Sequence, residues 1–145
     1  MRTQTRGIYA THIDWFRSAV GGENVVLRGK SALEYWLYFS GYANDNEIDV
    51  YSISIGDYEN INYHIVDSFD GIDYVRDGDV LCSTVNQAIN DMLNDENADE
   101  VALAEALSDH YHLNGKSFDG LNIRPENMQR FEEMKEWAME YYDEG

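Results

Sequence analysis

Two carboxylates spaced two residues apart, Glu47 and Asp49, are the residues of this chain best placed for chemistry. They begin the segment 47–55, which is rich in β-formers and predicts a strand. Side chains two residues apart on a strand face the same side, so the two carboxylates could share one site. Upstream, Val25–Leu27 predicts a buried strand, and Arg28-Gly-Lys30 predicts a turn that leads into a helix. The carboxylate pair therefore follows a strand–turn–helix unit.

Other metal-binding patterns in the sequence are incomplete. Asp95-x-Asn97-x-Asp99 supplies the first three ligands of an EF-hand calcium loop, but the glycine and the bidentate glutamate that complete such a loop are missing. His110-x-His112 falls in a segment that predicts a helix, where residues two apart do not share a face. We therefore expect no metal at either place.

The strand–turn–helix–strand unit resembles the start of the nucleotidyltransferase fold. That family has a Gly-Gly or Gly-Ser turn after a strand, then a helix, then an Asp-x-Asp pair on the next strand. Leu27-Arg-Gly-Lys-Ser-Ala-Leu33 and Glu47-Ile-Asp49 stand at these places, although Lys30 replaces the second small residue of the turn. The resemblance implies that Glu47 and Asp49 hold magnesium ions that clamp a nucleotide's phosphates. Asp67 or Asp73 would supply a third carboxylate.

The same region is similar to the body domain of abortive-infection type E antitoxins, which belong to type IV toxin–antitoxin systems. The similarity rests on Lys30-Ser-Ala-Leu33, on Glu47-Ile-Asp-Val-Tyr51 and on the strand–Thr–helix element from Val80 to Leu93, and it covers roughly Val25 to Leu107. Those antitoxins restrain toxins that act as nucleotidyltransferases. The resemblance therefore implies an inhibitory or interaction role rather than catalysis.

Negative charge is concentrated in the middle of the chain. The formal net charge is −18, and the segment from Gly41 to Asp109 holds seventeen acidic residues against one basic residue, Arg76. A field of this sign repels nucleic acid and anionic membranes and attracts basic surfaces. We therefore expect a basic protein partner, such as a toxin or a nuclease, and no direct binding to nucleic acid or membrane.

Nine acidic residues are the candidate contacts with that partner, and most of them fall in turns or at predicted strand edges. They are Asp45, Asp57, Glu59, Asp70, Asp73, Asp77, Asp79, Asp95 and Asp99. Tyrosines among these acids, such as Tyr51, Tyr58, Tyr63 and Tyr74, could anchor the contact or could pack within the sheet.

The primary hypothesis is a small acidic, non-catalytic inhibitor that uses no cofactor and binds the basic face of an enzyme acting on nucleic acids or nucleotides. An acidic face can mimic the regular charge of DNA, as inhibitors of restriction and CRISPR nucleases from phages and mobile elements do. Antitoxin and anti-defence inhibitor are both open. A divergent metal-dependent nucleotidyltransferase using Glu47 and Asp49 is one alternative, and an acidic structural or oligomerising module is another. The oligomeric state is left open.

The elements that must position these residues predict an α+β fold in one domain spanning residues 1–145. A helix–strand–helix unit comes first, and Ser31-x-x-Glu34 is a capping box expected to open its second helix. A β-meander of about four strands follows, with Asp77-Gly78 as a hairpin turn. Three helices complete the chain; they are expected to start at Thr84, at Asn97 or Asp99, and at Pro125.

Cysteine content and hydropathy suggest the compartment. Cys82 is the single cysteine, so no disulfide can form within the chain, and its acidic surroundings favour a small buried hydrophobe over a reactive thiol. The first residues lack the apolar region of a secretory signal, and no stretch approaches the length of a membrane span. We therefore expect a cytoplasmic protein.

Overall fold

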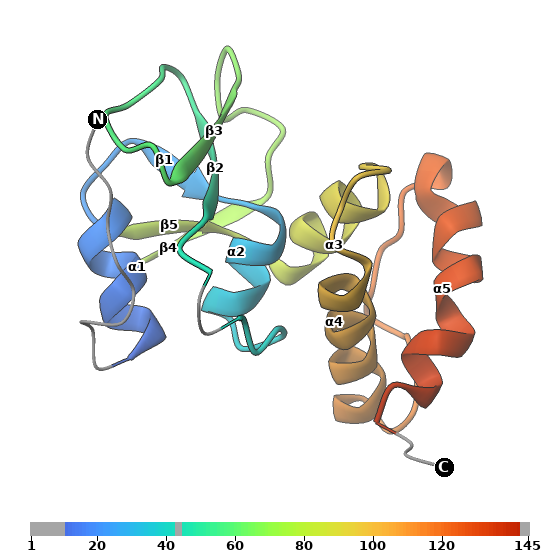
Figure 1. Cartoon of the computed structure of the whole chain (residues 1–145). Helices are drawn as coiled ribbons and strands as arrows, with labels where there is room; N and C mark the ends of the chain where they lie inside the picture. Colours follow the sequence, from blue (N-terminus) through green and yellow to red (C-terminus); the bar gives the residue numbers. More distant parts are fainter. Residues whose placement is uncertain (1–10, 43–44, 143–145) are drawn as a thin grey trace.

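The computed structural model describes residues 11–42 and 45–142, and in these it contains five α-helices and a five-stranded mixed sheet. The expected α+β class is confirmed, and the helix–strand–helix start and the three C-terminal helices are present (Figure 1). In chain order the elements are α1 (His12–Val20), β1 (Val25–Leu27), α2 (Gly29–Tyr35), β2 (Ile48–Ser52), β3 (Ile61–Ile65), β4 (Tyr74–Asp77), β5 (Val80–Ser83), α3 (Val85–Leu93), α4 (Glu100–Leu113), the 3-10 turn η2 (Pro125–Asn127) and α5 (Met128–Glu140).

The strand order is β3-β2-β1-β5-β4, which differs from the predicted meander. β1 is antiparallel to β2 and parallel to β5, and β2 is parallel to β3. Of the predicted meander, β2 and β3 pair in parallel and β3 does not pair with β4, so only β4–β5 forms the antiparallel hairpin that a meander requires. The reason lies in the Val25–Leu27 run: it is apolar at every position and buried throughout, and a strand covered on both faces belongs in the middle of a sheet.

The β4–β5 hairpin turns one residue later than its sequence predicts. Asp77 pairs with Val80, so Gly78 and Asp79 are the two central residues of the turn. Gly78 has φ +62° at the first central position, a left-handed conformation that glycine adopts without strain. The predicted hairpin turn is therefore present, but Gly78 occupies its first central position instead of the second.

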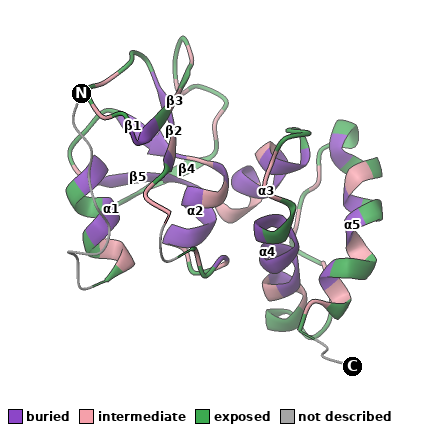
Figure 2. Ribbon diagram, in the orientation of Figure 1, coloured by how far each residue is buried: buried purple, intermediate pink, exposed green. Residues whose placement is uncertain are grey.

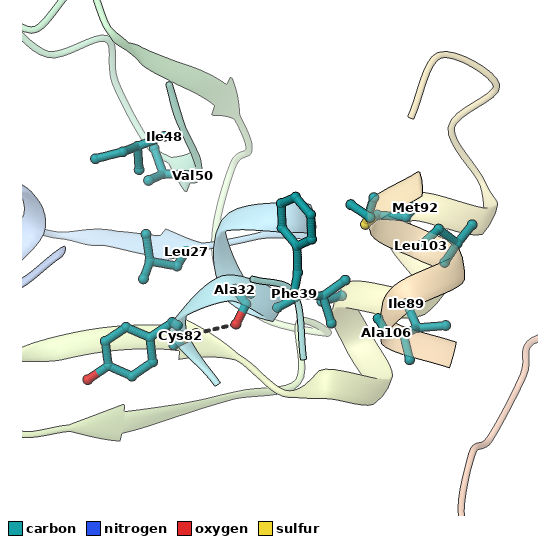
Figure 3. Packing of buried hydrophobic residues seen from close by; sticks show 14 of the residues in the cluster. Leu27, Ala32, Phe39, Ile48, Val50, Cys82, Ile89, Met92, Leu103 and Ala106 are labelled. Atoms are coloured by element: carbon teal, nitrogen blue, oxygen red, sulfur yellow. Dashed lines mark hydrogen bonds between the residues drawn. The ribbon is translucent and has the colours of Figure 1, made fainter. Parts of the chain in front are cut away.

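A continuous core joins the sheet to the C-terminal helices. Helix α2 is buried over most of its length and contacts both β2 and α3 (Figure 2). Figure 3 shows Leu27, Ile48 and Val50 on the sheet side and Ile89 and Met92 on the helical side, with Ala32 and Phe39 between them. One cluster of buried apolar side chains runs from Trp15 in α1 to Ala138 in α5.

Cys82 is a fully buried member of this core, as its sequence context predicts. Its Sγ lies 3.9 Å from the carbonyl oxygen of Ala32 (Figure 3). Burial, with the nearby Asp77 charge, raises the pKa of the thiol far above its ordinary value. Among residues 11–42 and 45–142, no helix combines the length and the apolar character that a bilayer crossing demands.

Candidate functional site

A cleft of about 320 Å³ opens where the C-terminal end of β1 meets the N-terminal ends of β2 and β3. Among the described residues, five carboxylates and two cations line it. We call it the acidic cleft, and its lining residues are Arg28, Gly29, Lys30, Glu47, Asp49, Asn62, Asp91, Met92, Asp95, Asn97, Ala98 and Asp99. The Arg28-Gly-Lys30 turn and the Glu47–Asp49 pair therefore line one cavity, together with residues from α3 and the α3–α4 connection.

The β1–α2 turn is tied directly to the strand that carries the carboxylates. Gly29 has φ +54°, so the chain enters α2 through a left-handed residue. The backbone N–H of Arg28 donates to the carbonyl of Asp49 (3.0 Å), and the backbone N–H of Asp49 donates to the hydroxyl of Ser31 (2.9 Å). These two hydrogen bonds fix the distance between the turn and the acidic pair.

The capping box expected from Ser31 and Glu34 is wrong. Helix α2 begins at Gly29, with Arg28 as its N-cap in place of Ser31, three residues earlier, and no side chain caps it. The Ser31 hydroxyl is instead used by β2, because the turn places it beside the Asp49 backbone. A serine with the spacing of a capping residue thus stabilises the site and not the helix end.

Glu47 and Asp49 are bridged by one amide group. Asn62 lies opposite Asp49 in the parallel β2–β3 ladder. Its Nδ2 donates to Oε2 of Glu47 (3.1 Å) and to Oδ1 of Asp49 (2.9 Å). The two carboxylates therefore do face a common space, as their spacing predicts, and an uncharged side chain from the next strand stands between them.

Neither residue expected to supply a third carboxylate belongs to the acidic cleft. Asp73 accepts a hydrogen bond from the Thr84 hydroxyl (3.1 Å), and Asp67 lies exposed in the β3–β4 connection. The reason is the parallel pairing of β2 and β3, which brings Asn62 next to the pair. In the described part of the chain, no group of three or more His, Cys, Asp or Glu side chains is arranged to hold a metal ion.

Both cations of the acidic cleft are held by neighbouring side chains. Lys30 Nζ lies 3.1 Å from Oδ2 of Asp45. Burial lowers the pKa of Lys30, but the hydrogen bond and charge of Asp45, with Asp49 and Asp99 beyond, raise it above its ordinary value overall. The Arg28 guanidinium lies 4.7 Å from the centroid of the Tyr51 ring, a cation–π arrangement.

Tyrosine hydroxyls fix two of the cleft carboxylates. Tyr51 donates to Oδ2 of Asp91 (2.5 Å), and Tyr42 donates to Oδ2 of Asp99 (2.9 Å). Burial and then the hydrogen bond to Asp91 raise the pKa of Tyr51. His64 packs edge-on against Tyr51, and burial together with the Arg28 charge lowers its pKa. Two separate tyrosine–carboxylate hydrogen bonds thus hold side chains of the acidic cleft.

The nine acids expected to contact a partner do not gather on one face. Asp95 and Asp99 line the acidic cleft, and Asp45 adjoins it through Lys30. Asp77 and Asp79 lie at the opposite end of the sheet, where β5 begins. The other four belong to connections between strands: Asp57 and Glu59 follow β2, and Asp70 and Asp73 precede β4.

At the hairpin end each carboxylate has its own donor. The Tyr35 hydroxyl donates to Oδ2 of Asp77 (2.5 Å). Asp79 pairs with Arg17 of α1, with 3.5 Å between Oδ1 and Nε. The Asp77 carboxylate and burial together raise the pKa of Tyr35, with burial the larger cause.

Three functional residues of the acidic cleft were missed in the sequence: Asn62, Tyr42 and Asp91. Asn62 could be found only from the β2–β3 register, which no local pattern encodes. Tyr42 and Asp91 lie 57 and 40 residues from the groups they bind, so their roles depend on how the helices pack against the sheet. For these three residues, the one sequence feature that pointed toward the acidic cleft was the density of acidic residues around the α3–α4 connection.

No protein-family model matches the chain, and comparisons with curated proteins and with solved structures also give no match. What the chain does must therefore be inferred from the acidic cleft and the surfaces around it.

Proposed function

We propose that this protein is a small acidic inhibitor that binds, without catalysis of its own, the basic face of an enzyme that processes nucleic acids or nucleotides. The observation that carries the proposal is the bridge made by Asn62, whose amide stands between Glu47 and Asp49. The two carboxylates are thus joined by a neutral donor of the chain itself. This favours a binding role for the acidic cleft over phosphoryl chemistry.

The hydrogen bonds inside the acidic cleft leave most of its acceptor capacity available. An ionised carboxylate offers about four lone-pair positions, and one amide or hydroxyl donor uses one of them. The planar guanidinium of arginine presents several N–H donors in a fixed fork and binds carboxylates in pairs. A cleft with five carboxylates is therefore chemically suited to arginine or lysine side chains of a partner.

The carboxylates are also held in place before a partner arrives. Asn62, Tyr42 and Tyr51 each fix a cleft carboxylate in one orientation. Binding to fixed groups loses less side-chain entropy than binding to mobile ones. The net charge of −18 adds long-range attraction, which accelerates association with a basic protein and weakens as salt is added.

The test is inhibition of a captured enzyme. The immobilised chain would be exposed to an extract of the cells that encode it, and bound enzymes would be assayed with and without added protein. We expect a basic enzyme acting on nucleic acids or nucleotides, inhibited at low ionic strength and released by salt. Capture of no basic enzyme, or capture without inhibition, would contradict the proposal.

A matched pair of double variants separates the acidic cleft from net charge. Glu47→Gln with Asp95→Asn removes two charges from the cleft, and Asp119→Asn with Glu136→Gln removes two exposed charges elsewhere. We expect the first pair to weaken inhibition strongly and the second to leave it nearly unchanged. Equal effects would indicate that the charge acts only through its total, as in a structural module whose acids serve solubility.

A divergent metal-dependent nucleotidyltransferase is the second candidate, favoured by one specific observation. The Gly29 turn, the start of α2 and the Glu47–Asp49 pair meet in one cavity, which the resemblance to that fold implies. Calorimetric titration with magnesium or manganese plus nucleotide tests it. Binding that Asp49→Asn abolishes would support this candidate, and no binding, or binding that survives the substitution, would eliminate it.

A further inference from the structure

Strand β4 forms an open edge of the sheet. Within residues 11–42 and 45–142 only β5 pairs with it, and all four of its residues are exposed (Figure 2). Among the described residues, the backbone groups of Tyr74–Asp77 hydrogen-bond only toward β5. In an antiparallel pair, alternate residues of an edge strand point their N–H and C=O groups outward. β4 therefore offers directional backbone donors and acceptors that an extended chain could use.

The edge carries apolar side chains on both faces of the sheet. Tyr74 is 37% exposed and Val75 is 42% exposed. Tyr74 contacts Phe69 edge-on, with 6.0 Å between ring centroids, and Val75 lies directly opposite the buried Cys82. Side chains of an added strand would pack against these two residues, as cross-strand neighbours do within a sheet.

Carboxylates flank both ends of the edge. Asp73 precedes β4, and Asp77 and Asp79 lie at its far end, about 13 Å away for four extended residues. Asp73 is fixed by Thr84, Asp77 by Tyr35 and Asp79 by Arg17. Arg76 is the only cation within the strand. An incoming strand would thus meet negative charge at both of its ends.

We propose that β4 accepts an extended basic segment of the partner protein as an added strand, with lysine or arginine at each end of about four β-forming residues. This inference rests on the proposed function, because it specifies the form in which a basic partner binds. A second copy of the chain is a poor occupant, since it would bring the same flanking carboxylates against one another. Backbone pairing supplies affinity in this mode, and the flanking charges supply selectivity.

The probe is the capped peptide Lys-Thr-Val-Thr-Val-Lys, added to the full-length protein and followed by amide hydrogen exchange in NMR. We expect alternate amides of β4 to exchange at least about tenfold more slowly when the peptide is bound. The same peptide N-methylated at alternate residues lacks the pairing N–H groups and should not bind. A peptide with glutamate at both ends should not bind either.

Two protein variants test the flanking charges. Asp79→Asn removes an exposed carboxylate beside β4 and should weaken the peptide about two- to threefold, the size expected for one exposed ion pair. Asp119→Asn removes an exposed carboxylate far along the chain and should have no effect. Equal weakening by both would overturn the charge-matching part of the inference.

Three results would overturn the inference as a whole. They are no binding of the peptide, binding without protection of β4 amides, and protection that appears with rising protein concentration alone, which would identify a second copy as the occupant. Competition then separates the inference from the proposed function. A captured enzyme that stays bound at saturating peptide supports the proposed function and contradicts β4 as its docking site. Protection by the peptide with no enzyme ever captured supports an acceptor edge and contradicts the proposed function.

Discussion

The two ends of the sheet use acidic residues differently. At the acidic cleft, carboxylates are close neighbours, and Asn62 joins two of them within one cavity. At the hairpin end, Asp77 and Asp79 stand apart, each with a separate donor from α2 or α1. Residues of one acidic stretch in the sequence therefore lie on separate surfaces of the fold. The fold divides this stretch between an open cleft, in whose lining Glu47 and Asp95 are exposed, and an exposed strand edge.

Removing the phenol groups that hold the acids should affect the acidic cleft more than the hairpin. Tyr51→Phe should lower the free energy of unfolding by about 1.5–3 kcal/mol, because Asp91 is half-buried and its charge loses a hydrogen bond that water replaces poorly. Tyr35→Phe should cost about 1 kcal/mol, because water can reach the exposed Asp77. Urea unfolding measures both, and equal losses would break the distinction between the two ends.

Placing a third carboxylate beside Glu47 and Asp49 should test the role of the amide bridge. Asn62→Asp removes the donors to Glu47 and Asp49 and adds repulsion, which should cost about 1–2 kcal/mol at this exposed position. Millimolar magnesium or calcium should restore the loss, because three carboxylates from two strands suit a hard cation. Unfolding with and without the ions measures this. Asn62→Ala is the control and should show no dependence on the ions.

Alkaline pH should loosen the rim of the acidic cleft before the chain unfolds. Burial and the hydrogen bond to Asp99 raise the pKa of Tyr42 to about 12. A raised pKa means that the folded state favours the neutral phenol, so this contribution to stability is complete below about pH 10 and is lost as the pH rises toward 12. Phenolate absorbance of wild type and Tyr42→Phe should therefore differ mainly near pH 12. A difference centred near pH 10 would show that the bond to Asp99 is absent in solution.

The smallest effect should come from the ion pair at the hairpin end. Arg17 and Asp79 are each about half exposed, at 50% and 52% of their side chains. Arg17→Gln should therefore change the free energy of unfolding by less than about 1 kcal/mol, and salt should reduce the difference further. Thermal unfolding at low and high salt measures it. A larger loss would mean that the hairpin end is as tightly organised as the acidic cleft.

Local signals in the sequence located the elements well. Thr84 and Asp99 cap helices at expected starts, and the turn predicted at Asp77-Gly78 is displaced by a single residue. These features depend on neighbours within a few positions, which a sequence displays directly.

The acidic cleft was only half predictable, for a physical reason. Glu47 and Asp49 could be paired from strand periodicity alone. The role of Asn62 could not be predicted, because its position depends on the parallel pairing of β2 and β3. That pairing requires the connection between the two strands to return to the same end of the sheet. Ser31 was predicted as a helix cap, but a hydroxyl near a helix start can accept a hydrogen bond from the helix or from the next strand. Because the chain enters α2 through the left-handed Gly29, the Ser31 hydroxyl accepts from the backbone of Asp49 in β2.

Because Cys82 is buried, the reactivity of its thiol can be used to measure motions of the core. The thiol lies between the sheet and α2, and its raised pKa keeps it protonated in the folded state. A maleimide or disulfide reagent can therefore react only when β5 and α2 separate, and the labelling rate in native buffer measures how often that separation occurs. A partner that spans the sheet would slow this labelling without touching the sulfur.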